Sequence, residues 1–145
     1  MQTKNYFLSL DKTGMLKKKF NLDLSSVCKD YDLFWLKNKE KEDEFYVGYS
    51  NLDVNIFVPA LNAEQLYAIL PLEIYTDDCG KCSLNVTSDV IDDREVYIVS
   101  YDIVKDKGYP YITFSGENLV DALFDAIEYC HNEKYFQPDA YIEEE

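Results

Sequence analysis

The sequence predicts an α+β fold in which a largely antiparallel sheet forms a meander and two main helices pack on one face. Three observations carry this prediction. A capped helix is signalled over residues 62–70, four strand-like runs follow it, and the apolar period then changes from two to about 3.6 residues after residue 115. Short turns rich in aspartate or glycine separate the four runs, which favours antiparallel neighbours.

The first helix has the strongest local signal, in the stretch ALNAEQLYAILP. Asn62 can cap the helix, and Gln65 at the third helical position can complete a capping box. Leu61 and Leu66 have the spacing of a hydrophobic staple across the same helix start. Pro71 disfavours a helical residue before it, so the helix is expected to end there.

Strands are predicted from alternation and from aromatic and β-branched residues. The meander is expected in the runs LEIYT, CSLNVTS, REVYIVSYDIV and YPYITFS. The first part of the chain is also expected to be mainly β, with KNKEKEDE as a charged turn. The expected strands there are residues 6–10, 16–24, 33–37, 45–49 and 54–58.

A second helix is predicted in SGENLVDALFDAIEYCHNEKY, with Ser115 as its cap. Its apolar stripe should pack across the meander. The stripe consists of Leu119, Ala122, Leu123, Ala126, Ile127 and Cys130. Pro138 ends the helical pattern, and we expect the acidic tail, about residues 137–145, to be frayed unless Tyr141 and Ile142 dock.

The composition indicates one domain covering residues 1–145. The chain is 47% hydrophobic and 15% aromatic, which is enough for a single core. The start MQTKNYFLSLDKTGM lacks the apolar region of an export signal, and no apolar run is long enough for a membrane span. We therefore expect a cytoplasmic protein with reduced cysteines.

The net charge of −14 is unevenly distributed along the chain. Residues 61–145 carry 19 acidic and five basic residues. Such a surface repels nucleic acid and anionic membranes, so neither is expected as a direct partner. Lys17, Lys18 and Lys19 form the one basic cluster and are expected on a solvated hairpin edge.

Common catalytic motifs are missing from the sequence. A single histidine, His131, leaves no histidine-based metal cluster and little room for a serine or cysteine triad, and this histidine is expected on the surface. The five glycines form no phosphate-binding loop, and neither HExxH nor GxSxG occurs. We therefore expect a protein without enzymatic activity and without a cofactor.

Cys79 and Cys82 form a CxxC pair with three interpretations. A redox pair requires a following helix whose N-terminus stabilises the thiolate, but strand-like runs lie on both sides here. A zinc site requires two further ligands, and none of the candidates forms a second close pair. These candidates are Cys28, Cys130 and His131. A hairpin turn with Gly80 at its tip is favoured, and a metal-binding or thiol-dependent protein remains the alternative.

Four carboxylates recur along the second helix at intervals of four, four and three residues. We call Glu117, Asp121, Asp125 and Glu128 the acidic row. Helix geometry places such residues on one side, about 6 Å apart per four-residue step, near the spacing of successive phosphates on a strand. The acidic row is thus a candidate contact for a basic, nucleic-acid-binding protein; an ordinary solvated face is the other interpretation.

Two stretches also carry a resemblance. VPALNAEQLYAILP, followed by a meander and by FSGENLVDALFDAIEYC, resembles small uncharacterised proteins encoded by phages, prophages and other mobile elements of gut bacteria. The resemblance covers most of residues 30–135 and implies an α+β fold and a mobile-element setting. Its matching features are helix caps, a proline stop and an apolar stripe, so it supplies no catalytic residues.

Together these observations lead to one functional hypothesis. The chain is expected to be a non-enzymatic accessory protein of the phage or mobile-element type, in the cytoplasm of a bacterial host, that binds another macromolecule. Its specific form is an acidic inhibitor that mimics nucleic acid and blocks a host nucleic-acid-handling or defence protein. The sequence leaves the oligomeric state open.

Overall fold

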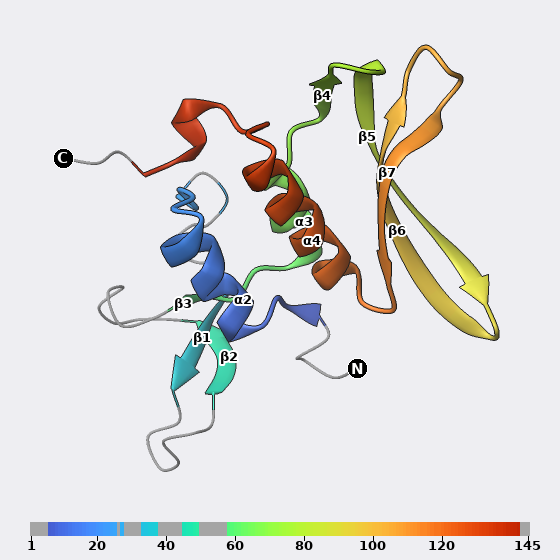
Figure 1. Ribbon diagram of the computed structural model, residues 1–145. Coiled ribbons are helices and arrows are strands. Elements are labelled where there is room, and N and C mark those ends of the chain that lie inside the picture. Colours follow the sequence, from blue (N-terminus) through green and yellow to red (C-terminus); the bar gives the residue numbers. More distant parts are fainter. Residues whose placement is uncertain (1–5, 26, 28–32, 38–44, 50–57, 143–145) are drawn as a thin grey trace.

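The computed structural model describes residues 6–25, 27, 33–37, 45–49 and 58–142. Within these residues, the α-helix α4 (Leu119–Asn132) lies between a four-stranded sheet and a helical segment near the N-terminus (Figure 1). The fold is α+β, as the sequence predicts. No helix in the described part of the chain is both long and apolar enough to cross a membrane.

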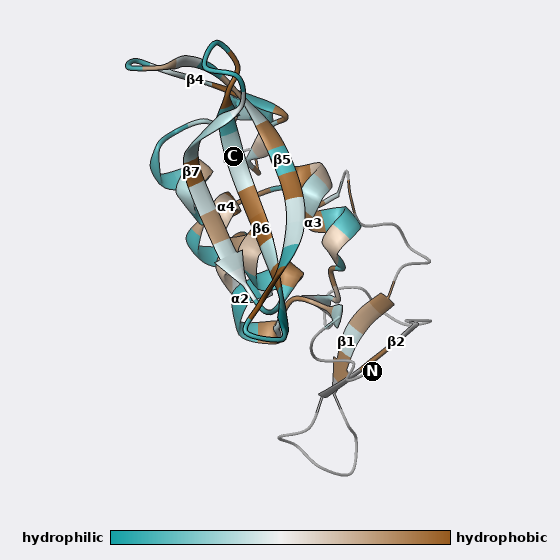
Figure 2. Ribbon diagram, turned by 90° about the vertical axis from the view of Figure 1, so that its right-hand side faces the viewer, coloured by the Kyte–Doolittle hydropathy of each residue, from teal (hydrophilic) through white to brown (hydrophobic). Residues whose placement is uncertain are grey.

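The four-stranded sheet is the predicted antiparallel meander. Its strands are β4 (Glu73–Thr76), β5 (Gly80–Ile91), β6 (Arg94–Ile103) and β7 (Tyr109–Gly116), in the order β4-β5-β6-β7. Figure 2 looks onto this sheet, with the helices behind it. One side of the sheet contributes buried residues such as Cys82 and Tyr101 to the core, while Asn85 and Thr87 on the other side are exposed. This is the usual pattern for an antiparallel sheet with one wet face.

Helix α4 occupies the centre of the molecule. It packs against β6 and β7 on one side and against α3 (Ala63–Ile69) on another. On a third side, Phe20 stacks on Phe124 with ring centroids 6.1 Å apart. Seven of its residues are buried: Val120, Ala122, Leu123, Phe124, Ala126, Ile127 and Cys130.

The predicted cap of α4 was wrong by three residues. Ser115 lies within β7, where it pairs with Ile98 of β6, because the strand runs on to Gly116. Asn118 caps the helix instead: its side chain accepts a hydrogen bond from the backbone N–H of Val120 at 3.2 Å. The four residues SGEN thus divide between the end of a strand and the start of a helix.

Helix α3 has the predicted boundaries and cap. The Asn62 side chain accepts from the Gln65 N–H, and the Gln65 side chain accepts from the Asn62 N–H, both at 2.9 Å. Leu61 and Leu66 are both buried, as a staple requires. The helix ends at Ile69, before the proline.

The prediction of strands at residues 6–10 and 16–24 was wrong. A short helix, α2 (Leu10–Gly14), continues into a π-helical turn, η1 (Met15–Lys19), and the three lysines therefore end a helix instead of lining a hairpin edge. The Ser9 side chain caps α2 by accepting from the Lys12 N–H at 3.2 Å. Leu16 and Phe20, four residues apart, point into the core.

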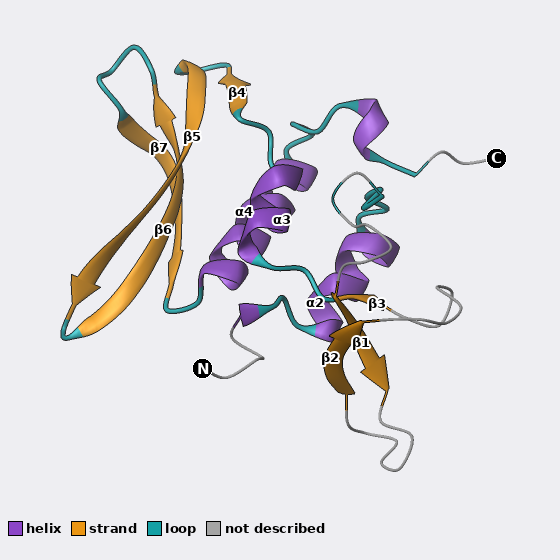
Figure 3. Ribbon diagram, turned by 180° about the vertical axis from the view of Figure 1, so that it is seen from behind, coloured by secondary structure: helices purple, strands orange, loops and turns teal. Residues whose placement is uncertain are grey.

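A second sheet lies apart from the first, in the order β2-β1-β3 (Figure 3). Its strands are β1 (Leu33–Lys37), β2 (Phe45–Tyr49) and β3 (Val58–Pro59). The predictions for β1 and β2 are confirmed. All but the first residue of the expected turn, and all but the last residue of the expected strand 54–58, lie outside the described residues. The Trp35 indole donates to the Leu8 carbonyl at 3.0 Å, which ties β1 to the N-terminal segment.

The C-terminal tail docks as far as Ile142, after the 3-10 turn η3 (Pro138–Ala140). Tyr141 forms an isolated antiparallel bridge with Leu22. The Ile142 N–H donates to the Asn21 carbonyl at 3.0 Å, and the Asp23 N–H donates to the Ala140 carbonyl at 2.8 Å. Residues 143–145 lie outside the described part.

We expect Asn62→Ala to lower the free energy of unfolding by about 1 kcal/mol, because it removes one half of the capping box. Urea denaturation measures the change. The matched control is Asn85→Ala on the exposed side of the sheet, which we expect to change stability by less than about 0.5 kcal/mol. An equal loss in both variants would contradict a specific role of the cap.

Candidate functional site

The acidic row is the first candidate site, and the structure divides it. Asp121, Asp125 and Glu128 lie on α4, but Glu117 precedes the Asn118 cap and is therefore not a helical residue. Within residues 120–128, every residue other than the three acids is buried. The three acids are thus the part of this stretch that solvent or a partner can reach.

Two members of the row are paired with bases from elsewhere in the chain. The Lys12 Nζ lies 2.9 Å from Asp121 Oδ1, and the Arg94 Nη1 lies 2.9 Å from Glu117 Oε1. Lys12 also lies over the Phe124 ring, 5.3 Å from its centroid. Exposed pairs of this kind contribute about 0–1 kcal/mol.

These pairs could not be found from the sequence. Lys12 is 109 residues from Asp121, and Arg94 is 23 residues from Glu117. No local spacing signals either contact. The sequence correctly shows that no lysine shares the helical row, but lysine and arginine side chains reach it from α2 and β6.

Asp125 and Glu128 have no ion pair among the described residues. Burial raises the pKa of Asp125; the Lys12 charge opposes this shift, while the charges of Glu128 and Asp121 add to it. A carboxylate that is partly desolvated and lies between two like charges gains most from an incoming cation. The centre of the candidate site is therefore the Asp125–Glu128 half of the row.

The CxxC pair is part of a hairpin turn, as the sequence favours. Gly80 begins β5 with a φ of 70°, a left-handed conformation that glycine adopts without strain. The Thr76 hydroxyl donates to the Gly80 carbonyl at 3.1 Å and accepts from the Cys79 N–H at 3.0 Å. Thr76 therefore organises the turn that brings the two cysteines together.

The environments of Cys82 and Cys130 do not favour a thiolate. Cys82 is buried, and this burial raises the pKa of its thiol. Burial likewise raises the pKa of Cys130 to about 11, and the Cys130 thiol lies 3.5 Å from the Tyr101 hydroxyl. In the described part of the chain, no three histidine, cysteine or carboxylate residues lie together so that they could hold a metal ion. Cys28 lies outside that part.

His131 is half-buried, contrary to the expectation of a surface residue. Its ring packs on Phe20, with centroids 4.7 Å apart, and its Nδ1 lies 3.2 Å from the Tyr141 hydroxyl. The docked tail and the turn after η1 cover it. The sequence does not show this, because residues 16–24 were expected to form a strand and the docking of Tyr141 was left open.

A cavity of about 430 Å³ lies where the N-terminal ends of α3 and α4 meet Tyr6 and Tyr97. Its charged lining residues, Glu64 and Glu117, are both acidic. The side chains of Asn62 and Asn118 cap the two helix ends, so these amides already bond to backbone N–H groups. The sequence does not indicate this cavity, because its tyrosines come from distant segments.

Comparison of the chain with protein-family models, with curated proteins and with solved structures finds no match.

We expect Asp125→Asn to raise the free energy of unfolding at pH 7 by about 0.2–0.5 kcal/mol, because it removes a charge that burial and the like charges of Glu128 and Asp121 disfavour, an effect that the Lys12 charge partly offsets. The raised folded-state pKa means that protonation stabilises the folded protein. The gain should therefore shrink as the pH falls through that pKa. Urea denaturation between pH 4 and pH 8 measures it, with Asp77→Asn in the exposed β4–β5 turn as the control; destabilisation at pH 7 would contradict the argument.

The two cysteines should differ in their effects on stability. We expect Cys82→Ser to lower the free energy of unfolding by about 1–3 kcal/mol, because it replaces a fully buried thiol, which lies 3.8 Å from the Gly80 carbonyl oxygen, with a hydroxyl that costs more to bury. Cys79→Ser should change it by less than about 0.5 kcal/mol, since Cys79 is only half-buried. Thermal and urea denaturation under reducing conditions compare them, and equal losses would show that the pair acts as one structural unit.

Proposed function

We propose that this protein is non-enzymatic and acts by binding a basic protein partner through the acidic row. One observation carries the proposal: along residues 120–128, α4 is buried everywhere except at Asp121, Asp125 and Glu128. Two of these carboxylates have no ion pair among the described residues. A cationic partner surface would compensate charges that the protein itself leaves uncompensated.

The partner class that fits best is a protein that itself handles nucleic acid. Asp121, Asp125 and Glu128 rise about 6 Å and then about 4.5 Å along the helix, so three negative charges span about 10 Å of a rigid element. A groove that binds a phosphate backbone presents cations at comparable spacing. Glu117 is less suited to the contact, because Arg94 already binds it.

This function agrees with the resemblance to accessory proteins of phages and mobile elements, and with the cytoplasm of a bacterial host as its place of action. A small acidic inhibitor of a host nucleic-acid-handling or defence protein has these properties. The net charge of −14 supports the same proposal, since it favours encounter with basic proteins over encounter with nucleic acid. The thiol-dependent alternative has less support, because Cys82 is buried and its pKa is raised.

The test compares two variants with the same change in net charge. Asp125→Lys with Glu128→Lys reverses the unpaired half of the row and leaves the Lys12–Asp121 pair in place. Asp77→Lys with Asp78→Lys reverses two exposed turn residues at the edge of the sheet. Each immobilised protein is exposed to bacterial lysate at low and high salt. The captured proteins are then purified, and their binding to each variant is measured directly.

We expect wild type and the turn variant to capture the same basic, nucleic-acid-binding protein at low salt, and the α4 variant to lose at least about 90% of it. Binding should weaken as salt screens the charges. An equal loss of capture in both variants would show that binding depends on net charge and not on the position of these carboxylates. Unchanged capture by the α4 variant would overturn the proposal.

A further inference from the structure

Strand β5 has a long free edge. It spans twelve residues, but β4 pairs only with Gly80–Ser83, and the last contact on that side is the Leu84 N–H donating to the Leu72 carbonyl at 2.9 Å. Among the described residues, no strand lies beside residues 85–91 on this side. Figure 3 shows this part of the β5–β6 hairpin projecting beyond the helices. Val90 is 68% exposed and Ile91 is 51% exposed.

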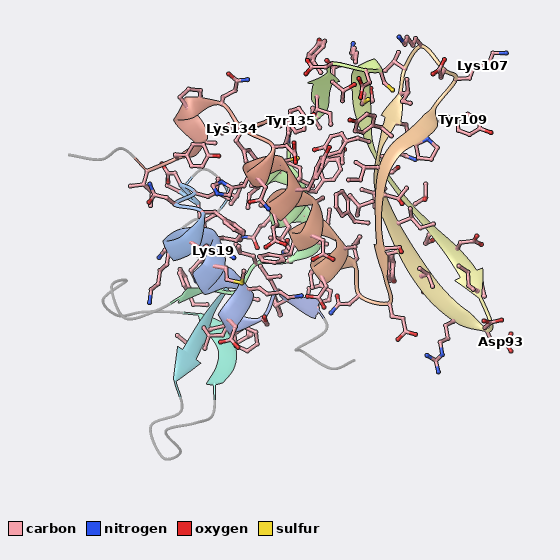
Figure 4. The ribbon with its side chains drawn as sticks, in the orientation of Figure 1. Lys19, Asp93, Lys107, Tyr109, Lys134 and Tyr135 are labelled. Carbon is pink, nitrogen blue, oxygen red and sulfur yellow. The ribbon has the colours of Figure 1, made fainter. Side chains whose placement is uncertain are left out.

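The turn at the end of the hairpin decides which backbone groups face the free edge. Asp92 and Asp93, between β5 and β6, have φ angles of 53° and 63°, as a two-residue type I′ turn requires. Figure 4 labels Asp93 at the tip of this hairpin. Ile91 and Arg94 beside this turn form a hydrogen-bonded pair, so the odd residues of β5 bond to β6. The backbone N–H and C=O groups of the even residues of β5 therefore point away from β6, toward the free edge.

Two observed hydrogen bonds agree with this parity. The Leu84 N–H donates to the Leu72 carbonyl on the β4 side, and the Val90 N–H donates to the adjacent Asp89 side chain at 2.8 Å. Val86, Ser88 and Val90 therefore present their N–H and C=O groups along the free edge. This is a row of three backbone donors and three acceptors.

The free edge of β5 lacks most of the features that prevent an edge strand from pairing with another chain. Residues 85–91 contain no proline and no lysine. The opposite edge of the sheet differs, because β7 contains Pro110 and a bulge opposite Tyr101 and Asp102. On β5, Asp89 is the one charged residue of the segment, and it satisfies one of the outward donors.

We propose that this edge pairs antiparallel with the same edge of a second copy of the chain, with the two-fold axis at Ser88. In this register Ser88 lies opposite Ser88 of the second copy, and Val86 lies opposite Val90. Val86, Ser88 and Val90 of each chain, whose backbone groups face the free edge, then lie opposite the same three residues of the other chain. In this dimer the Val90 N–H donates to a backbone carbonyl of the second copy instead of to the Asp89 side chain.

The side chains select this register and this occupant. Asp89 lies opposite Thr87 of the second copy, so no like charges face each other across the axis. A shift by two residues toward the turn would place Asp89 opposite Asp89. A shift toward β4 would require the Leu84 N–H, which is already bonded to Leu72. Of these three registers, only the one centred on Ser88 uses all three outward residues of each chain and places no carboxylates directly opposite each other.

The dimer should be weak and should strengthen with salt. Seven residues per chain are far fewer than the roughly 20–30 per side of a standard interface, so the dimer is expected to be much weaker than one with a standard interface. Each chain carries a net charge of −14, and salt screens their mutual repulsion. Partner binding through the acidic row should instead weaken with salt. The dimer and the partner binding can therefore be tested separately.

Sedimentation equilibrium of the full chain between about 10 μM and 1 mM, in 50 mM and 500 mM salt, tests the proposal. Ser88→Lys places two ammonium groups opposite each other on the axis without changing the backbone. Thr113→Lys makes the same charge change on β7, away from this edge. Circular dichroism confirms that each variant is folded.

We expect wild type and Thr113→Lys to dimerise at high concentration, more strongly at 500 mM salt. The Kd of Ser88→Lys should be at least about tenfold higher, because like charges directly opposite each other destabilise a strand pair. A wild type that stays monomeric up to 1 mM at both salt concentrations would overturn the proposal. A dimer that Ser88→Lys leaves unchanged would also overturn it.

Discussion

The structure depends on the burial of α4 between the four-stranded sheet and the N-terminal helical segment. Leu123 and Ile127 are buried within this layer, and burying a side chain of this size contributes about 1.5–3 kcal/mol. Phe20 reaches α4 from the opposite side to the sheet and packs on both Phe124 and His131. The docked tail covers the same end of the helix. Most elements of the described fold are therefore held through one helix.

This central position also decides which part of α4 can interact. A helix packed on three sides leaves one narrow stripe to solvent, and here that stripe is acidic. The Lys12 side chain lies at its start, where it pairs with Asp121 and lies over Phe124. The uncompensated charge is thus confined to Asp125 and Glu128, one turn further along. The acidic excess extends throughout residues 61–145, and the packing of α4 selects the few carboxylates of this helix that remain accessible.

The sequence predicts the elements whose signals are local. The capping box of α3 depends on Asn62 and Gln65, three residues apart, and the meander on short turns between alternating runs. The N-terminal segment was misassigned because LSL and FNLDL alternate as strands do, whereas Leu16 and Phe20 also fit a helix, and the contact of Phe20 with Phe124 favours the helix. The partners of Asp121 and Glu117 could not be predicted, because ion pairs between distant segments leave no local pattern.

The acidic excess acts differently on the two surfaces proposed for binding. On α4 it is a source of attraction, because a basic partner can neutralise Asp125 and Glu128. At the β5 edge it opposes association, because each chain approaches another of the same charge. Asp89 adds a local effect, since its side chain occupies the Val90 N–H that a second strand would need. A partner that neutralised much of the negative charge would therefore also lower the barrier to pairing at β5, so that binding at α4 would favour dimerisation without any change in the fold.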